Sequence, residues 1–392
     1  MEKQTPSMKI DYFLIMIILS LGAISAFTLY SIDPYLPAKY DNINFVTQQL
    51  TWYALGAVAI GFIMLLDYDR LRNLTWIIYA IGILLLLGLE FNVPSAYVKT
   101  LNGATGWYEI PGIGTFQPAE FMKVFIVITL SHVIVGHQEK FPQPRVKDDF
   151  WLLLKIFVIA IIPLGLIAKQ PDLGGALVIS AIVASMLLVS GIRWRFLLIL
   201  FGSVAILVSG AIGIYYFFPD LVLNLTRNSD YKHAFVRFYG WLSPQEYASS
   251  YGLQLIKAML AIGSGQLFGK GISNIEVYIP ERHTDMIFTA IAEQFGFLGA
   301  SIVVTLFFLM IYRIIDTALE SNDPFGSFLC TGFIGMFTFQ VFQNIGMSIQ
   351  LLPITGLPLP FISYGGSSLV TYMIAIGIVL NVRSRTKVYM FD

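Results

Sequence analysis

Long apolar runs separated by short polar segments dominate the pattern of this chain. A hydrocarbon core about 30 Å thick needs about 20 mostly apolar residues per helix. The sequence therefore predicts an all-α polytopic membrane protein, with residues 1–392 forming a single integral membrane domain. Ten membrane-spanning helices are expected, at residues 12–30, 47–66, 74–91, 118–136, 151–168, 173–191, 196–217, 286–315, 325–349 and 364–382.

Composition supports this class, because 56% of the residues are hydrophobic and only 12% are charged, whereas a soluble protein has about 25% charged residues. The formal net charge is zero, so nothing indicates binding to nucleic acid. The single cysteine, Cys330, excludes an intramolecular disulfide and a thiolate metal cluster. The first apolar run has no small-residue cleavage site, so we expect an uncleaved first span.

The basic residues indicate the orientation, since cytoplasmic loops carry an excess of Lys and Arg. Ten spans place both termini on one side, and the lysines and arginines make that side cytoplasmic. Segments 92–117, 218–285 and 350–363 then face outward. The inner segments carry Lys3, Lys9, Arg70, Arg72, Lys140, Arg145, Lys147, Arg193, Arg195, Arg383, Arg385 and Lys387, and the short outer loops carry only Lys39, Lys99 and Lys169.

The longest polar stretch, residues 218–285, is predicted to be a large extracytoplasmic loop. Within it, residues 251–262 are apolar apart from Lys257, too short to span, and typical of a helix lying in the membrane interface. The following glycine-rich residues 263–271 do not match a nucleotide-binding loop, because their spacing differs from the Walker pattern. These glycines are expected to let the backbone approach a membrane helix or a substrate closely.

Ionisable residues gather at the outer end of the eighth span. They lie in the hexapeptide formed by Pro280, Glu281, Arg282, His283, Thr284 and Asp285. Such groups are costly to desolvate at a membrane boundary, which favours a functional site. The alternative is a helix cap, made by Thr284 or Asp285.

Two other outward segments carry charge. Glu120 and Lys123 share one face at the start of the fourth span, where they form either an internal ion pair or a wall that contacts an anionic or hydroxyl-bearing substrate. Asp172, in the turn between spans five and six, is expected to cap the next helix and to add a carboxylate to the outer face. The four histidines lack metal-ligand spacing, which argues against a protein-built zinc site.

Several motifs, in the same order along the chain, resemble those of the SEDS family, the shape, elongation, division and sporulation proteins that include RodA, FtsW and SpoVE. With Arg282 in residues 280–285, the chain resembles the RodA-like elongation branch more than the division branch. Gly106, Ala119 and Met286 depart from common family residues, and the first departure removes a possible phosphate contact. The resemblance is carried by residues 117–120, 169–174, 280–285 and 357–368.

The resemblance implies a peptidoglycan glycosyltransferase that polymerises lipid II, the undecaprenyl-pyrophosphate disaccharide pentapeptide, into β-1,4 glycan at the outer face of the bacterial cytoplasmic membrane for cell elongation and rod shape. Asp285 matches the essential acid of the family, Trp107 an important residue of its first outer loop, and Glu120 and Lys123 its polar pair. The expected partners are a class B penicillin-binding transpeptidase, other membrane proteins of the elongation complex, and membrane lipid.

In this interpretation Asp285 acts as the general base of an inverting single displacement. Lys123, Lys257 and Arg282 are candidates for holding the pyrophosphate. Glu281, His283, Thr284, Asp172 and Ser363 complete the expected substrate contacts.

No cofactor is predicted with certainty. A divalent cation, Mg²⁺ or Mn²⁺, would neutralise the pyrophosphate, and Glu120, Asp172 and Glu281 are equally plausible as its ligands and as salt-bridge partners. Two other functions stay open. A lipid II flippase or transporter would favour charges at the bilayer midplane and paired broken helices, and a non-catalytic scaffold for a transpeptidase would need no acid at position 285.

Overall fold

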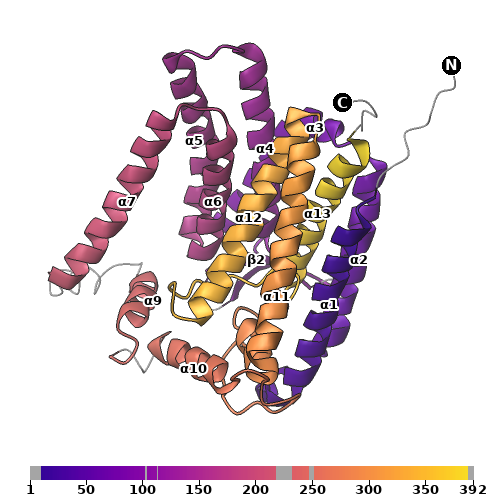
Figure 1. The fold of residues 1–392 in the computed structure, drawn as a ribbon, viewed down its shortest axis with the longest axis vertical. Coiled ribbons are helices and arrows are strands. Elements are labelled where there is room, and N and C mark those ends of the chain that lie inside the picture. The colour runs from indigo at the N-terminus through magenta and orange to yellow at the C-terminus, as the bar shows by residue number, and fades with distance from the viewer. Residues whose placement is uncertain (1–9, 102–103, 113, 218–231, 247–250, 387–392) are drawn as a thin grey trace.

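The computed structural model describes residues 10–101, 104–112, 114–217, 232–246 and 251–386, and in these ranges the chain is a helical bundle with a small sheet (Figure 1). All ten predicted spans form helices. The helices longer than one turn are α1 (Tyr12–Ile32), α2 (Phe45–Leu65), α3 (Asp69–Glu90), α4 (Pro118–Lys140), α5 (Val146–Lys169), α6 (Leu173–Val189), α7 (Trp194–Phe217), α9 (Lys232–Leu242), α10 (Tyr251–Ser264), α11 (Ile287–Glu320), α12 (Pro324–Ser348) and α13 (Gly366–Arg385).

In the part of the chain that the structure describes, nine helices are long and apolar enough to cross a membrane. The sixth predicted span, α6, has 17 residues, which is the lower limit for a spanning helix. Two helices, α3 and α5, begin earlier than expected, at Asp69 and Val146. The polytopic fold class is therefore confirmed, and α6 meets the length requirement only narrowly.

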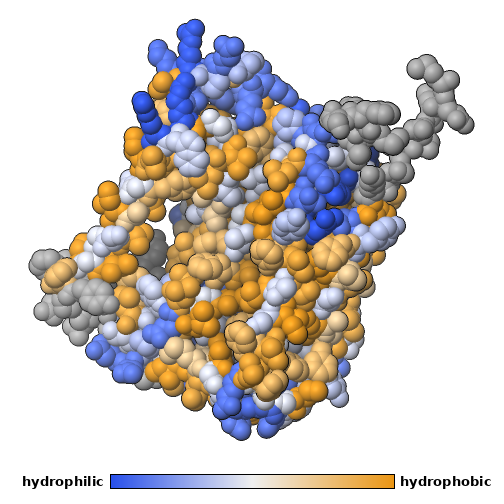
Figure 2. All heavy atoms as spheres, in the orientation of Figure 1, coloured by the Kyte–Doolittle hydropathy of each residue, from blue (hydrophilic) through white to orange (hydrophobic). Residues whose placement is uncertain are grey.

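The centre of the bundle is formed by α4, α12 and α13, whose residues are mostly buried, whereas α2 and α7 are mostly exposed. Figure 2 shows that hydrophobic side chains cover the middle of the visible surface, with hydrophilic residues gathered towards its two ends. Close packing of the central helices needs small residues. A Cβ on Gly332 of α12 would lie 2.6 Å from Val127 of α4, so this crossing requires glycine.

Ion pairs join the start of α1 and the end of α13 to the same end of α11. Arg313 of α11 binds Asp11, which precedes α1, at 2.8 Å. Arg383 of α13 binds Asp316 and Glu320 of α11 at 3.4 and 2.6 Å. The first and last spans therefore begin and end on one side of the bundle, as an even number of spans predicts.

A three-stranded antiparallel sheet at the other end was not predicted from the sequence. It consists of β1 (Val98–Leu101), β2 (Ala104–Ile110) and β3 (Gly114–Phe116), in the order β1-β2-β3. The Tyr108 hydroxyl donates to the Leu85 and Val93 carbonyls at 3.1 and 3.2 Å, which attaches β2 to the end of α3. Ser367 of α13 donates to the Thr115 carbonyl of β3 at 3.1 Å.

The described part of the long loop contains α9 and α10, beside the end of the bundle (Figure 1). The helix expected at residues 251–262 is confirmed as α10, and its position in a membrane interface stays a prediction. Two short 3₁₀ helices, Asp33–Tyr35 and Ala38–Tyr40, follow α1. Trp241 of α9 donates to the Gln350 carbonyl at 3.0 Å, so α9 is fastened to the loop after α12.

Candidate active site

A large cavity lies where the sheet, α9 and the loops before α11 and α13 meet. Its volume is about 1760 Å³, larger than the roughly 300–1,000 Å³ of a typical small-molecule site. It can therefore accept a substrate larger than a typical small-molecule ligand. Its charged lining residues, among those described, are Glu90, Glu109, Glu120, Lys169, Asp172, Arg237, Glu281 and Asp285.

Asp285 lies at this cavity, half-buried, in the segment that precedes α11. Burial raises the pKa of its carboxyl from 3.8 to about 6, while the hydrogen bond from the Thr284 hydroxyl, at 3.2 Å, opposes the change. The capping alternative is wrong, because Met286 is the N-cap residue of α11 and no side chain bonds there. Asp285 is therefore a carboxylate of increased basicity that faces a cavity and has no capping role.

The backbone around Asp285 is held by residues far away in the sequence. Asn344 of α12 donates to the Asp285 carbonyl at 2.7 Å, and Ser363 donates to the Thr284 carbonyl at 2.5 Å. The Tyr364 N–H donates to the His283 carbonyl at 3.0 Å. Three consecutive carbonyls are thus fixed by α12 and the loop before α13.

Ser363, predicted to contact substrate, is buried and does not line the cavity. Its hydroxyl also accepts from the Leu359 N–H at 2.8 Å, so both of its bonds are structural. Asn344 was not identified from the sequence, since an amide inside an apolar run gives no signal of its target.

The remaining residues of the hexapeptide divide into two groups. Glu281 and Thr284 line the cavity, and Glu281 binds Lys39 at 3.4 Å. His283 is buried against Tyr40 and Phe45, with ring centroids 4.9 and 4.6 Å apart. Burial lowers the His283 pKa, so the ring is neutral near pH 7. His283 therefore packs behind the cavity wall.

Glu120 and Lys123 share one face, as their spacing predicts, and form an ion pair of 2.6 Å. Glu120 lines the cavity, whereas Lys123 is fully buried. The second carboxylate oxygen of Glu120, Oε2, has no hydrogen-bond partner among the described residues. That oxygen is also buried, so the structure does not expose it to a substrate in the cavity.

Trp107 of β2 and Asp172 also line the cavity. Asp172 caps α6, as expected, by accepting from the Gly175 N–H at 2.8 Å, and Gln117 donates to its other oxygen at 3.3 Å. Asp172 is therefore both a cap and part of the wall.

None of the three cations proposed from the sequence, Lys123, Lys257 and Arg282, lines the cavity. Lys257 lies over the Tyr278 ring at 5.4 Å. Among the described residues, the cations in the lining are Lys169, paired with Glu90 at 3.0 Å, and Arg237 of α9, whose Nη1 lies 3.5 Å from the Thr355 carbonyl. Sequence reasoning missed Arg237 because the fold alone brings α9 to the site.

No group of three or more His, Cys, Asp or Glu side chains that could hold a metal ion occurs in the described residues. Mg²⁺ commonly binds one or two carboxylates together with substrate phosphates. The carboxylates in the cavity wall fit a metal ion that is also bound by substrate phosphates. The described residues do not provide a metal site built from protein ligands alone.

Comparison with known proteins identifies the family. A family model for FtsW, RodA and SpoVE, described as cell cycle protein, matches residues 10–388. The chain belongs to this family, the SEDS proteins. It is 35% identical over 385 residues to a probable peptidoglycan glycosyltransferase FtsW of Bacillus subtilis, covering 95% of this chain and 90% of the relative. It is 33% identical over 379 residues to stage V sporulation protein E of Bacillus subtilis, covering 95% and 96%.

Solved structures agree with this SEDS assignment. A chain of a peptidoglycan synthase complex, studied for the coordination of polymerization and crosslinking, matches with a TM-score of 0.76 and 27% identity over 95% of this chain and 97% of that chain. The rod shape determining protein RodA of Thermus thermophilus matches with a TM-score of 0.66 and 27% identity over 96% and 97%.

Proposed function

We propose that this SEDS chain is a peptidoglycan glycosyltransferase that polymerises lipid II into β-1,4 glycan at the outer face of the bacterial cytoplasmic membrane. The relatives named peptidoglycan glycosyltransferase support the reaction class. The observation that carries the proposal is Asp285, a carboxylate of raised pKa at a cavity of about 1760 Å³. A carboxylate with a pKa near the working pH suits a general base.

In the proposed reaction Asp285 removes the proton from the 4-hydroxyl of the acceptor GlcNAc. That oxygen attacks C1 of the donor MurNAc as the bond from C1 to the pyrophosphate oxygen breaks, so the anomeric carbon inverts. The leaving pyrophosphate keeps the electron pair, and the proton stays on Asp285. Base catalysis of this kind contributes about 10²–10⁴-fold to the rate.

The leaving group needs positive charge, and Arg237 and Lys169 are the described lining residues that can supply it. Six described lining residues are acidic, Glu90, Glu109, Glu120, Asp172, Glu281 and Asp285. Because acids outnumber cations there, we propose that Mg²⁺ or Mn²⁺ accompanies the pyrophosphate and that one or two of the wall carboxylates hold it. A bound divalent cation would supply electrostatic stabilisation of the leaving oxygen.

Three further features belong to the proposal. The whole chain forms one integral membrane domain. Both of its termini lie in the cytoplasm, because the segments on the same side of the membrane as the termini carry most of the lysines and arginines. Its partner is a class B penicillin-binding transpeptidase, since a peptidoglycan synthase complex contains a similar chain. Its role is cell elongation, together with other membrane proteins of that complex. Depletion that rounds rod-shaped cells supports elongation, and filamentation points to division.

The test is glycan formation from lipid II by purified protein, alone and with its transpeptidase partner, in detergent containing Mg²⁺. Wild type, Asp285→Ala and the control Asp11→Asn, which breaks an ion pair at the opposite end of the bundle, are compared. Long strands from wild type and the control but not from Asp285→Ala are expected. Strands from Asp285→Ala would reject the base, and strands from none would favour a flippase or a scaffold.

A further inference from the structure

The helix that follows Asp285 is interrupted. Gly296 of α11 has φ 62° and ψ −158°, outside the helical range. A break of this kind leaves backbone N–H and C=O groups that need partners. The segment 265–271, which follows α10, supplies them through four backbone hydrogen bonds: Lys270 N–H to Glu293 O, Gly271 N–H to Gln294 O, Phe297 N–H to Gln266 O, and Leu298 N–H to Leu267 O.

Two glycines make this contact possible. A Cβ on Gly265 would lie 2.0 Å from the Ala292 carbonyl oxygen, and one on Gly269 would lie 2.1 Å from that of Gln294. The expectation that residues 263–271 approach a membrane helix closely is therefore confirmed. The approach also carries the side chain of Lys270 towards the break.

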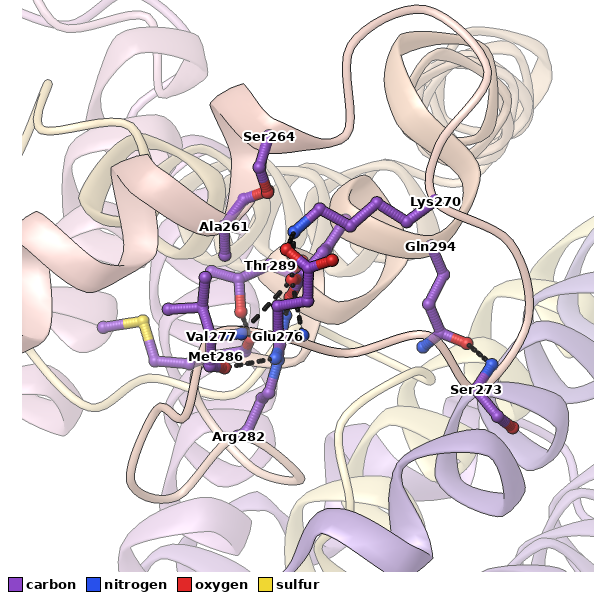
Figure 3. A network of polar contacts seen from close by, with 11 residues as sticks. Ala261, Ser264, Lys270, Ser273, Glu276, Val277, Arg282, Met286, Thr289 and Gln294 are labelled. Atoms are coloured by element: carbon purple, nitrogen blue, oxygen red, sulfur yellow. Dashed lines mark hydrogen bonds and ion pairs between the residues drawn. The ribbon is translucent and has the colours of Figure 1, made fainter.

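Glu293 lies one turn before the break and is fully buried. Its Oε2 binds Arg282 at 2.5 Å, and its Oε1 binds Lys270 at 3.0 Å. The same Oε1 accepts from the N–H groups of Glu276 and Val277 at 3.1 and 3.3 Å. Figure 3 shows how Lys270, Glu276, Val277 and Arg282 converge in this network. Both oxygens of one buried carboxylate are thus used, by two cations and two amides.

Arg282 extends this network to the segment that carries Asp285. Its guanidinium also donates to the carbonyls of Val277 and Thr289 at 2.8 and 3.0 Å. It is buried and does not line the cavity, although Asp285 follows it by three residues and does line it. The segment 281–285 is therefore held at one end by Glu293 and at the other by Asn344 and Ser363.

We propose that Glu293 is a positioning residue, which holds Arg282 and thereby fixes the placement of Asp285 in the cavity. The inference deepens the proposed function and rests on it, because placement of Asp285 matters only if that carboxylate acts on the substrate. Displacement of a catalytic group by about 1 Å can lower a rate by about 100-fold. Glu293 does not line the cavity that contains Asp285, so the route that we propose for its effect on the reaction runs through Arg282 and the segment 281–285.

Glu293→Gln tests this role at nearly constant volume. A carboxylate accepts on both oxygens, whereas an amide accepts on one atom and donates from the other. The amide NH₂ that this substitution introduces would therefore face either Arg282 or the other donors, which are Lys270 and the N–H groups of Glu276 and Val277. Two donors cannot bond to each other, so the donors that face the NH₂ lose their hydrogen bonds. We expect kcat to fall about 10- to 100-fold with a KM within twofold of wild type, because the substrate contacts stay in place.

The pH profile separates positioning from general damage. The charged groups that act on Asp285 directly are Glu281 of its own segment and Arg237 of α9. If the segment relaxes, Asp285 gains water, its pKa falls from about 6 towards 3.8, and the acid limb of kcat/KM moves to lower pH. A smaller amount of correctly folded enzyme would leave that limb in place.

The experiment compares wild type, Glu293→Gln, Arg282→Lys and Asp11→Asn in the lipid II assay across pH. Asp11 is a matched control, because its buried carboxylate accepts from the Leu14 N–H at 3.0 Å and from Arg313 at 2.8 Å, at the other end of the bundle. Arg282→Lys keeps the charge but cannot make all three guanidinium contacts. Lower kcat and a moved acid limb in both network variants, with the control unchanged, support the proposal.

Other outcomes overturn it. Network variants with wild-type kcat and an unmoved limb exclude positioning, while an active wild type leaves the proposed function intact. Failure of both variants to accumulate in the membrane, when Asp11→Asn does so, assigns the network to folding alone. A wild type that forms no glycan rejects the proposed function itself, and with it the base on which this inference depends.

Discussion

Asp285→Asn should stabilise the protein while it abolishes glycan formation. The Asp285 carboxyl has a pKa of about 6 instead of 3.8 because burial disfavours its charged form. Each pKa unit corresponds to about 1.4 kcal/mol, so a difference of about 2 gives an upper value near 3 kcal/mol at neutral pH. Water in the cavity screens part of this charge, and we therefore expect about 1–3 kcal/mol. Asparagine has nearly the same shape and no charge to bury.

The sign of the pH dependence follows from proton uptake. The native-state pKa of Asp285 is the higher one, so the folded protein binds more protons between about pH 4 and 6. The stability that comes from protonated Asp285 is complete below about pH 4 and is lost as the pH rises through about 6. The advantage of Asp285→Asn should therefore be absent near pH 4, grow through pH 6 and stay constant above it.

Thermal unfolding in detergent from pH 4.5 to 7.5 measures this difference. Asp172→Asn is the matched control on the same cavity wall, because asparagine caps a helix about as well as aspartate and Asp172 caps α6. We expect the control to unfold within a degree of wild type at every pH. An Asp285→Asn protein that unfolds with wild type above pH 6, or a gap that does not change with pH, would refute burial as the source of the raised pKa.

Three further changes have definite expected outcomes. Lys123→Met should cost about 3–5 kcal/mol, since it leaves Glu120 buried without its partner, and Glu120→Gln in the same chain should restore most of the melting temperature. Arg237→Gln should raise the KM for lipid II about tenfold, the loss of one charge-assisted contact. Gly269→Ala should lower the melting temperature, as its φ of 82° and the Gln294 carbonyl leave no room, whereas Gly263→Ala, with open space around it, should not.

The sequence predicted what local spacing determines. Apolar length gave the ten helices, the interval from Glu120 to Lys123 gave their ion pair, and the position of Asp172 before an apolar run gave the cap. Contacts between distant segments gave no such signal. Arg282 was assigned to the substrate because the sequence does not reveal that it pairs with Glu293. Glu293 lies inside an apolar span, and Arg282 precedes the helix α11 that contains Glu293, so helical spacing does not connect the two side chains.

The sheet and the interrupted helix were missed for related reasons. The strands β1 and β3 have four and three residues, which is too few to show an alternating pattern. The sheet is attached to the helices by the hydroxyls of Tyr108 and Ser367, which donate to backbone carbonyls of other segments. Gly296 lies inside an apolar run, where glycine is common in membrane helices. The break exists because the segment 265–271 replaces the lost hydrogen bonds, and that contact depends on the tertiary fold.

The raised pKa of Asp285 and the contacts around it have a common physical basis. A buried carboxylate can lower its free energy by moving into water, so a flexible segment would let Asp285 turn outward and lose its basicity. Asn344, Ser363 and the Tyr364 N–H oppose that movement by binding three successive carbonyls. Arg282 opposes it from the other end through Glu293. We therefore expect the basicity of Asp285 to depend on bonds made by its neighbours, and we expect the proposed base to act near neutral pH only while the segment 281–285 is held at both ends.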